Sequence, residues 1–206
     1  MIVRRLGMTD FDTTYEAMRA FTADRVAATA DELWITEHAP VYTVGAAGRP
    51  EHLPDANSAN GIPLKRIDRG GQITYHGPGQ IIVYTLLDLT RSHLKVRDLV
   101  RLLEQSVIEF LDAHHVVAAR NPGAPGVYVE GAKIAALGLR VTRRGCYHGV
   151  AMNVDMDLTP FYRIDPCGYP GLAVTQLRDV GIVAGVAEVG EHLATRIAGA
   201  LETAHA

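Results

Sequence analysis

The residues of this chain that could take part in chemistry are two cysteines, one lysine and a glycine-rich segment. Cys167 stands in RIDPCGYPG, where prolines and glycines predict an irregular loop, and such loops carry function more often than core packing. Cys146 stands between Gly145 and Tyr147 at the start of an apolar strand, which is typical of a buried structural thiol. We therefore interpret Cys167 as the candidate nucleophile, although a buried structural thiol is the alternative there too.

Lys133, in EGAKIAALG, begins a mostly apolar strand. Desolvation there would lower the pKa of its ammonium group and let it exchange protons near neutrality, whereas most lysines at strand ends are simply solvated. A thiol of pKa about 8.5 needs a base or a nearby cation to become a thiolate. Cys167 and Lys133 could thus form a dyad, and His38, His76 and His148 are alternative bases. No H-E-x-x-H or C-x-x-C motif occurs, so we expect no metal site.

The segment RGGQITYHGPGQ, residues 69–80, holds four glycines, a histidine and an arginine between two apolar strands. Its glycines allow positive φ angles and a close approach of the backbone to a ligand. A hairpin with a glycine-rich turn is an equally good interpretation of the spacing. Neither a Walker motif nor a dinucleotide-binding fingerprint is present.

The hydrophobic pattern predicts an α+β fold with a mixed sheet backed by helices, in one domain over residues 1–206. Strands are expected at 2–6, 32–36, 40–44, 64–68, 72–75, 80–86, 127–129, 133–141 and 148–154. Helices are expected at 11–28, with Thr9 or Asp10 as N-cap, at 96–115 and at 185–204. Glu130 and Gly131 should form a hairpin turn, and residues 46–61 a long surface loop.

The composition excludes several classes of protein. A net charge of -3 provides no general attraction to nucleic acid, and we expect no nucleic-acid partner. The N-terminus has no apolar segment of the export type, and nowhere do 18 apolar residues run together, so we expect a cytoplasmic protein that does not bind membranes. In a reducing compartment the two cysteines should not form a disulfide.

The motifs LWITEHAPVYTVG, RGGQITYHGPGQ, GAKIAALG, HGVAMNVDMDL and PCGYPG follow one another between residues 33 and 171. In this order the chain resembles the octanoyltransferases of lipoate biosynthesis. The departure within these motifs is Ala39, where the family more often has proline. The sequence after Gln176 carries no motif of the family, which leaves the choice of acceptor open.

The resemblance implies a fold similar to the catalytic domain of biotin and lipoate protein ligases. It implies that Cys167 forms an acyl-thioester and that Lys133 lowers the pKa of this thiol and handles protons, without a cofactor. It implies octanoyl-acyl carrier protein as donor, and lipoyl domains of 2-oxoacid dehydrogenase subunits and the glycine-cleavage H protein as acceptors. The residues that it implies for the acyl-substrate site are Arg69, Gly70, Gly71, Gln72, Ile73, Thr74, Tyr75, His76, Ala136, Leu137, Gly138, Gly149, Val150 and Ala151.

An apolar tunnel would suit the acyl chain, with Ile134 and Leu139 as further walls and small residues such as Gly149 leaving room. Backbone amides near Gly70, Gly71 or Gly138 could stabilise an oxyanion. A basic cluster in the next turn could steer an acidic carrier protein, or simply be solvated. This cluster consists of Arg140, Arg143 and Arg144.

Three other functions remain open from the residues themselves. In an ATP-dependent lipoate or biotin ligase, Lys133 would hold an acyl-adenylate and Cys167 would be incidental. A noncatalytic acyl-binding module would keep the tunnel but have no use for a reactive thiol. A Cys-His hydrolase would use His76 or His148 as its base.

Overall fold

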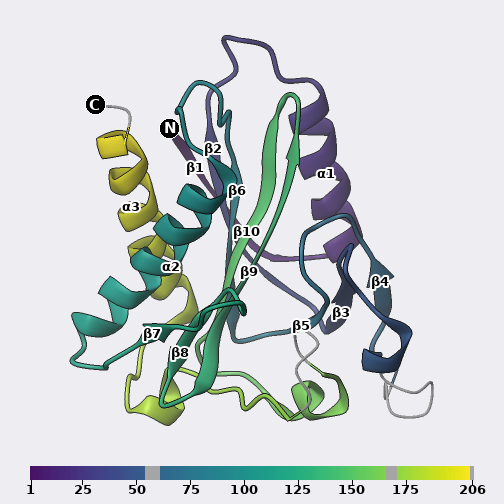
Figure 1. Ribbon diagram of the computed structural model, residues 1–206, viewed down its shortest axis with the longest axis vertical. Coiled ribbons are helices and arrows are strands. Elements are labelled where there is room, and N and C mark those ends of the chain that lie inside the picture. The colour runs from purple at the N-terminus through teal and green to yellow at the C-terminus, as the bar shows by residue number, and fades with distance from the viewer. Residues whose placement is uncertain (54–60, 166–170, 205–206) are drawn as a thin grey trace.

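Alternating side chains of the central strands divide the protein into two layers around one sheet. In β6 (Gln80–Leu86), Ile81 and Val83 face one hydrophobic cluster, whereas Ile82 and Tyr84 face another. This alternation is the period of an extended strand, and it requires cover on both faces. The computed structural model describes residues 1–53, 61–165 and 171–204, and Figure 1 shows their arrangement.

The large sheet has seven strands in the spatial order β1-β2-β6-β10-β9-β8-β7. The first pair is parallel and the remaining pairs are antiparallel, so the sheet is mixed, as predicted. Besides β6, its strands are β1 (Ile2–Thr9), β2 (Glu32–His38), β7 (Ala119–Arg120), β8 (Val127–Val129), β9 (Ala132–Thr142) and β10 (Gly145–Asn153). The β8–β9 hairpin turns at Glu130 and Gly131, both with positive φ, which confirms the predicted turn.

Helices α2 (Val96–Asp112) and α3 (Val186–Ala204) cover one face of this sheet, and α1 (Phe11–Ala23) covers the other (Figure 1). The larger hydrophobic cluster lies under α2 and α3, and the smaller one under Met18 of α1. The confirmed N-cap of α1 is Asp10, whose carboxylate accepts a hydrogen bond from the backbone N–H of Thr13. Among the described residues, no helix has the length and hydrophobicity that crossing a membrane requires.

The prediction that the first helix continues to residue 28 is wrong. Helix α1 ends at Ala23, and Val26, expected on its buried face, is 66% exposed. The chain leaves the helix because the guanidinium of Arg25 turns inward. It lies 2.5 Å from Asp31 Oδ1 and donates to the carbonyl oxygen of Leu86 at 3.1 Å.

A second sheet of three strands packs beside α1 (Figure 1). Its order is β4-β3-β5, with β4 at Leu64–Arg66, β3 at Val41–Val44 and β5 at Ile73–His76. Because β5 pairs with β3, and β6 pairs with β2 and β10, the glycine-rich segment between β5 and β6 is not a hairpin. It carries the chain from one sheet to the other.

Gly79 makes this crossing possible. Its φ is +86°, and an added Cβ atom would lie 1.9 Å from the carbonyl oxygen of Asp155. Its own carbonyl accepts the N–H groups of Val154 and Asp155. The glycine therefore allows a close approach to another backbone segment of the protein.

Candidate active site

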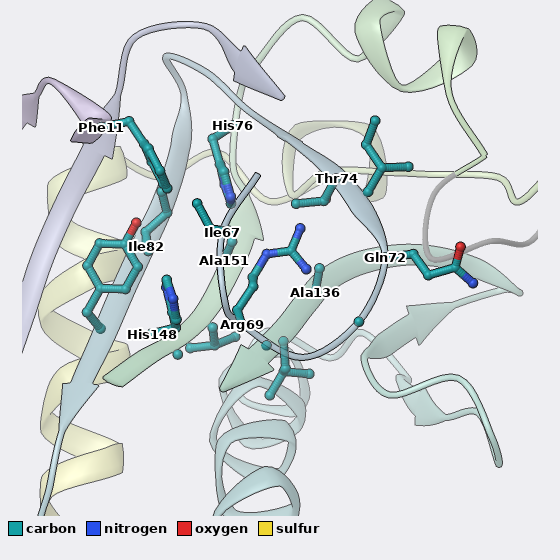
Figure 2. Close-up of a pocket in the computed structure, with 17 residues that line it drawn as sticks. Phe11, Ile67, Arg69, Gln72, Thr74, His76, Ile82, Ala136, His148 and Ala151 are labelled. Carbon is teal, nitrogen blue, oxygen red and sulfur yellow. The ribbon is translucent and has the colours of Figure 1, made fainter. Parts of the chain in front are cut away.

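A cavity of about 520 Å³, counting the space at its mouth, lies between the α1 face of the large sheet and strand β5. Figure 2 shows Phe11 and His148 on one side of it, Gln72 and Thr74 on the other, and Arg69 between them. The wall is mostly apolar or glycine, with a few polar side chains. It consists of Phe11, Ile67, Arg69, Gly71, Gln72, Ile73, Thr74, His76, Ile82, Tyr84, Ala136, Leu137, Gly138, His148, Gly149, Val150 and Ala151.

The residues expected to bind the acyl substrate line this cavity, apart from Gly70 and Tyr75. The backbone N–H of Gly70 donates to the carbonyl oxygen of Leu139 at 2.9 Å, so it is already engaged and does not suit an oxyanion. Tyr75 lies on the other face of β5, where its ring contacts Tyr42 and Phe161. Tyr75 therefore does not line the cavity.

One expectation about the walls is wrong: Leu139 packs against the core beneath α2 and α3 and lines neither this cavity nor the small one beside Lys133. Ile134 is fully buried in the same core and borders only that small cavity. Gly149 does line the cavity, but an added Cβ atom would lie 2.1 Å from the carbonyl oxygen of Val83. Glycine at this position is needed for the close approach of β10 to β6, in addition to any space it leaves.

Arg69 fixes the loop that covers the cavity. Its guanidinium is buried and donates to the carbonyl oxygen of Thr43 at 2.6 Å and to the Thr43 hydroxyl at 3.0 Å. It also donates to the carbonyl oxygen of Gly70 at 2.9 Å. These contacts tie the turn at Gly71, where φ is +83°, to strand β3.

Two buried histidines lie beside the cavity in their neutral form. His76 Nδ1 donates to Gln80 Oε1 at 2.7 Å, and His38 Nε2 pairs with the Tyr84 hydroxyl at 2.7 Å. Burial lowers the pKa of His76 to about 3 and also lowers the pKa of His38. A group with so low a pKa is a poor base at neutral pH, so the burial of His76 does not favour it as the base that activates a thiol.

A β-bulge places Lys133 relative to the cavity. Val127 of β8 pairs with Ala135 of β9, whereas the next residue, Tyr128, pairs with Lys133. Strand β9 therefore has one extra residue, Ile134, at this point. In a regular strand, residues three apart point to opposite faces. Because of the bulge, Lys133 and Ala136, which are three positions apart, point to the same face of the sheet.

As a result, Lys133 and Ala136 line the same small cavity, which shares Thr74 and Ala136 with the larger one. Lys133 is 3% exposed. Its Nζ donates to the carbonyl oxygen of Pro125 at 3.2 Å and lies 5.2 Å from the ring centre of Tyr128. Both neighbours stabilise an ammonium group.

Cys167 lies outside the described residues, but the chain on both sides of it is held near this region. On one side, the N–H of Lys133 donates to the carbonyl oxygen of Ala173 at 2.8 Å. On the other side, the N–H of Asp165 donates to the carbonyl oxygen of His52 at 3.4 Å. Ala173 follows Cys167 by six positions in the sequence, a span of at most about 22 Å.

The sequence reasoning missed a polar cluster behind the opposite end of the cavity. Asp68 accepts hydrogen bonds from the hydroxyls of Tyr15, at 2.9 Å, and Tyr147, and lies 3.4 Å from His148 Nε2 and 3.7 Å from Arg140. Burial alone would raise the pKa of Asp68, but these hydrogen bonds hold it well below its usual range. The signal available in the sequence was that Asp68 immediately precedes the RGG motif.

Cys146 is fully buried, as expected of a structural thiol. Its Sγ donates to the carbonyl oxygen of Thr85 at 3.6 Å. Burial raises the pKa of this thiol to about 12, which keeps it protonated and unreactive.

The expected basic cluster lies around an open groove between α1 and the β9–β10 turn, where Arg19 joins it. Part of its charge is used within the protein. Arg140 pairs with Asp68, and Arg144 donates to the carbonyl oxygen of Ala23 at 2.9 Å. The remaining face of the groove presents Arg143.

The fold of this chain is that of known ligases. It superimposes on a lipoate-protein ligase A bound with ATP with a TM-score of 0.78 at 19% identity, covering 98% of this chain and 86% of the ligase. The biotin protein ligase of Aquifex aeolicus gives a TM-score of 0.57 at 13% identity, covering 98% and 70%. The mixed sheet, its helices and the cavity thus define a protein of the lipoate and biotin ligase fold class.

Sequence relationships narrow this class. Residues 12–198 match the family of lipoyl protein ligase A/B catalytic domains. The octanoyltransferase of Aromatoleum aromaticum is 59% identical over 96% of this chain and 84% of its own length. That of Azoarcus sp. is 60% identical over 94% and 84%. The chain therefore belongs to the octanoyltransferases of this family.

Proposed function

We propose that the chain transfers an octanoyl group from octanoyl-acyl carrier protein to a specific lysine of lipoyl domains, through a thioester on Cys167. The acceptors would be 2-oxoacid dehydrogenase subunits and the glycine-cleavage H protein. Membership in the octanoyltransferases supports the reaction. The observation that carries the proposal is the position of Lys133, a buried amine at the end of an apolar cavity.

The first half-reaction forms the thioester on the enzyme. The Cys167 thiolate attacks the octanoyl carbonyl carbon, the bond between that carbon and the carrier sulfur breaks, and the carrier thiolate leaves and takes up a proton. In the second half-reaction the acceptor amine attacks the same carbon. The amide forms, the amine loses a proton, and the Cys167 thiolate is restored. An amide is more stable than a thioester, so the transfer needs no ATP.

Lys133 suits the proton and charge requirements of both steps. As an ammonium held by the Pro125 carbonyl and the Tyr128 ring, it would stabilise the Cys167 thiolate. It would donate a proton to the departing carrier thiolate, and the resulting amine would take a proton from the acceptor amine. This cycle returns Lys133 to its starting state after each turnover.

The cavity supplies the affinity for the acyl chain. About seven carbon units can be buried against its apolar wall, at about 0.8 kcal/mol each, which amounts to roughly 6 kcal/mol. The shared residues Thr74 and Ala136 connect this space with Lys133. An acyl chain in the cavity would therefore place its carbonyl at the Lys133 end.

The test is capture of the thioester. Incubated with octanoyl carrier protein, without ATP and without acceptor, the protein should gain the mass of one octanoyl group on the peptide that contains Cys167. Hydroxylamine should remove it, and a lipoyl domain should accept it on its lysine. Cys167→Ala should abolish both steps, whereas Cys146→Ala should preserve them. An adduct on Cys146, or transfer that requires ATP, would contradict the proposal.

A further inference from the structure

The end of the cavity opposite Lys133 is closed by aromatic side chains from three separate elements. Phe11 begins α1, Tyr84 belongs to β6, and His148 belongs to β10. In Figure 2, Phe11 and His148 lie on the side of the cavity away from Thr74. An acyl chain whose carbonyl lies near Lys133 would point its methyl end at these three rings.

Two chain segments, together with Tyr15 of α1, separate this end from the arginine groove. In the segment at β10, His148 lines the cavity, whereas the preceding residue, Tyr147, lines the groove. In the loop before β5, Ile67 and Arg69 line the cavity, whereas Asp68 between them lines the groove. Removing one ring from this wall would therefore lengthen the space available to the chain.

Backbone and side-chain contacts both hold His148 in place. Its φ is +66°, a left-handed conformation that is rare for a residue with a side chain, and its carbonyl oxygen accepts the Thr85 hydroxyl at 3.0 Å. Its Nε2 lies 3.4 Å from Asp68 Oδ1, and its ring stacks on Tyr15 with 5.6 Å between centres. Asp68 in turn accepts hydrogen bonds from Tyr15 and Tyr147, so the ring is fixed from both sides.

The spacing along β9 fits an eight-carbon chain. His148 pairs with Leu139, six positions after Lys133, and one of these positions is the bulge at Ile134. Five regular steps of about 3.3 Å give about 17 Å. Eight extended carbons span about 9 Å at about 1.25 Å per carbon. The sulfur of the thioester and a contact distance of about 4 Å at each end account for all of the remaining ~8 Å.

We propose that His148, positioned by Asp68, is the stop that limits the acyl chain to about eight carbons. This inference rests on the proposed octanoyl transfer and adds to it the residue that determines chain length. The ring is a physical barrier, and its left-handed backbone fixes the direction in which it points. Asp68 acts through His148 and is a positioning residue.

The positive φ of His148 permits a clean test. Glycine adopts this conformation without strain, so His148→Gly should remove the ring and leave the backbone in place. Asparagine also tolerates it and fills part of the space. His115 provides a matched control, because it is an exposed histidine with a φ of +62°. Asp68→Asn keeps the size of the side chain but removes the charge that holds the ring.

The measurement is kcat/KM for carrier protein loaded with octanoyl, decanoyl and dodecanoyl groups. An imidazole extends about 4.5 Å beyond its Cα atom, which corresponds to two to four carbons at about 1.25 Å each. Each newly accommodated methylene should improve kcat/KM about fourfold. The ratio of decanoyl to octanoyl transfer should therefore rise about 15-fold in His148→Gly, less in His148→Asn and Asp68→Asn, and not at all in His115→Gly.

Thermal stabilisation by free octanoate, decanoate and dodecanoate provides a readout of cavity depth that does not depend on transfer. If His148→Gly is folded and active but keeps the wild-type length profile in both measurements, the inference is wrong. Loss of transfer at every length by a folded His148→Gly would also overturn it, because the ring would then have another role. If His148→Gly does not fold, the same two measurements on His148→Asn test the inference. A wild-type protein that transfers no octanoyl group would instead refute the proposed function.

Discussion

Acid should destabilise this protein through its buried histidines, and His76 allows the size of the effect to be worked out. In the folded state its Nδ1 donates to Gln80 Oε1 and its Nε2 faces the Thr43 hydroxyl at 3.3 Å, so the neutral ring is satisfied. Burial, followed by the nearby His38 and Arg69, lowers its pKa from 6.5 to about 3. Above pH 6.5 the ring is neutral in both the folded and the unfolded state, and it contributes no pH dependence.

Below pH 6.5 the unfolded chain takes up a proton that folded His76 refuses. The free energy of unfolding must then fall with pH, by about 1.36 kcal/mol per unit until the folded pKa is reached. Between pH 7.5 and pH 5.0 the loss from His76 alone is about 2 kcal/mol. The lowered pKa values of His38 and His148, also caused by burial, add losses of the same sign.

The assay is urea denaturation of the wild type and of His76→Asn at pH 7.5 and 5.0. Asparagine can still donate to Gln80 but does not titrate, so the variant should lose about 2 kcal/mol less than the wild type over this interval. His93→Asn, which changes an exposed histidine with a φ of +52°, should behave like the wild type. Equal losses for the wild type and His76→Asn would refute the reasoning.

Three further predictions concern the catalytic lysine, the packing of the large sheet and the arginine groove. Lys133→Met keeps the buried stem but removes the charge, so transfer should fall by about 10² to 10⁴ and the pH needed for alkylation of the catalytic thiol should rise. Gly149→Ala should lower the free energy of unfolding by about 3 kcal/mol or more, because the new methyl group meets the carbonyl of β6. Its control is Gly199→Ala, where an added Cβ atom meets nothing within 4 Å outside the local helix backbone, and this change should stabilise α3 by about 0.5 to 1 kcal/mol. Arg140→Gln combined with Arg143→Gln should raise the KM for the carrier protein and flatten its dependence on salt.

Each of these predictions has a result that would contradict it. Wild-type transfer by Lys133→Met would remove the lysine from the mechanism. A Gly149→Ala variant as stable as the wild type would show that β10 and β6 can separate without cost. An unchanged KM and salt dependence in the double arginine variant would mean that the groove does not meet the donor.

The sequence predicted the elements whose signal is local. The bounds of β6 are as predicted, because its apolar run ends at clear turn residues on both sides. The hairpin at Glu130 and Gly131 and the cap at Asp10 also follow from short-range rules. Short-range rules do not predict the end of α1, because it depends on the contacts of Arg25 with Asp31 and with the backbone carbonyl of Leu86 in β6. The helical spacing of apolar residues continues past Ala23 in the sequence and does not indicate these contacts.

The candidate site divides in the same way. Motif residues such as Arg69 and Ala136 could be assigned to one cavity wall through the family resemblance. Phe11 and Tyr84 could not, because each looks like ordinary core and they meet only when α1 packs on the large sheet. Tyr75 shows the opposite error, because it was assigned to the cavity as part of a continuous motif. Successive side chains of a strand point to opposite faces, and the ring of Tyr75 points away from the cavity.

The bulge at Ile134 makes the length of β9 as significant as its composition. Before the bulge the odd position 133 faces the small cavity, and after it the even positions 136 and 138 face the larger one. Deleting one residue between Lys133 and Ala136 would leave every functional side chain in the protein but turn the lysine to the opposite face of the sheet. In comparing or grafting this strand among relatives, the number of residues from the lysine to Ala136 must therefore be kept, even where the residues between them change.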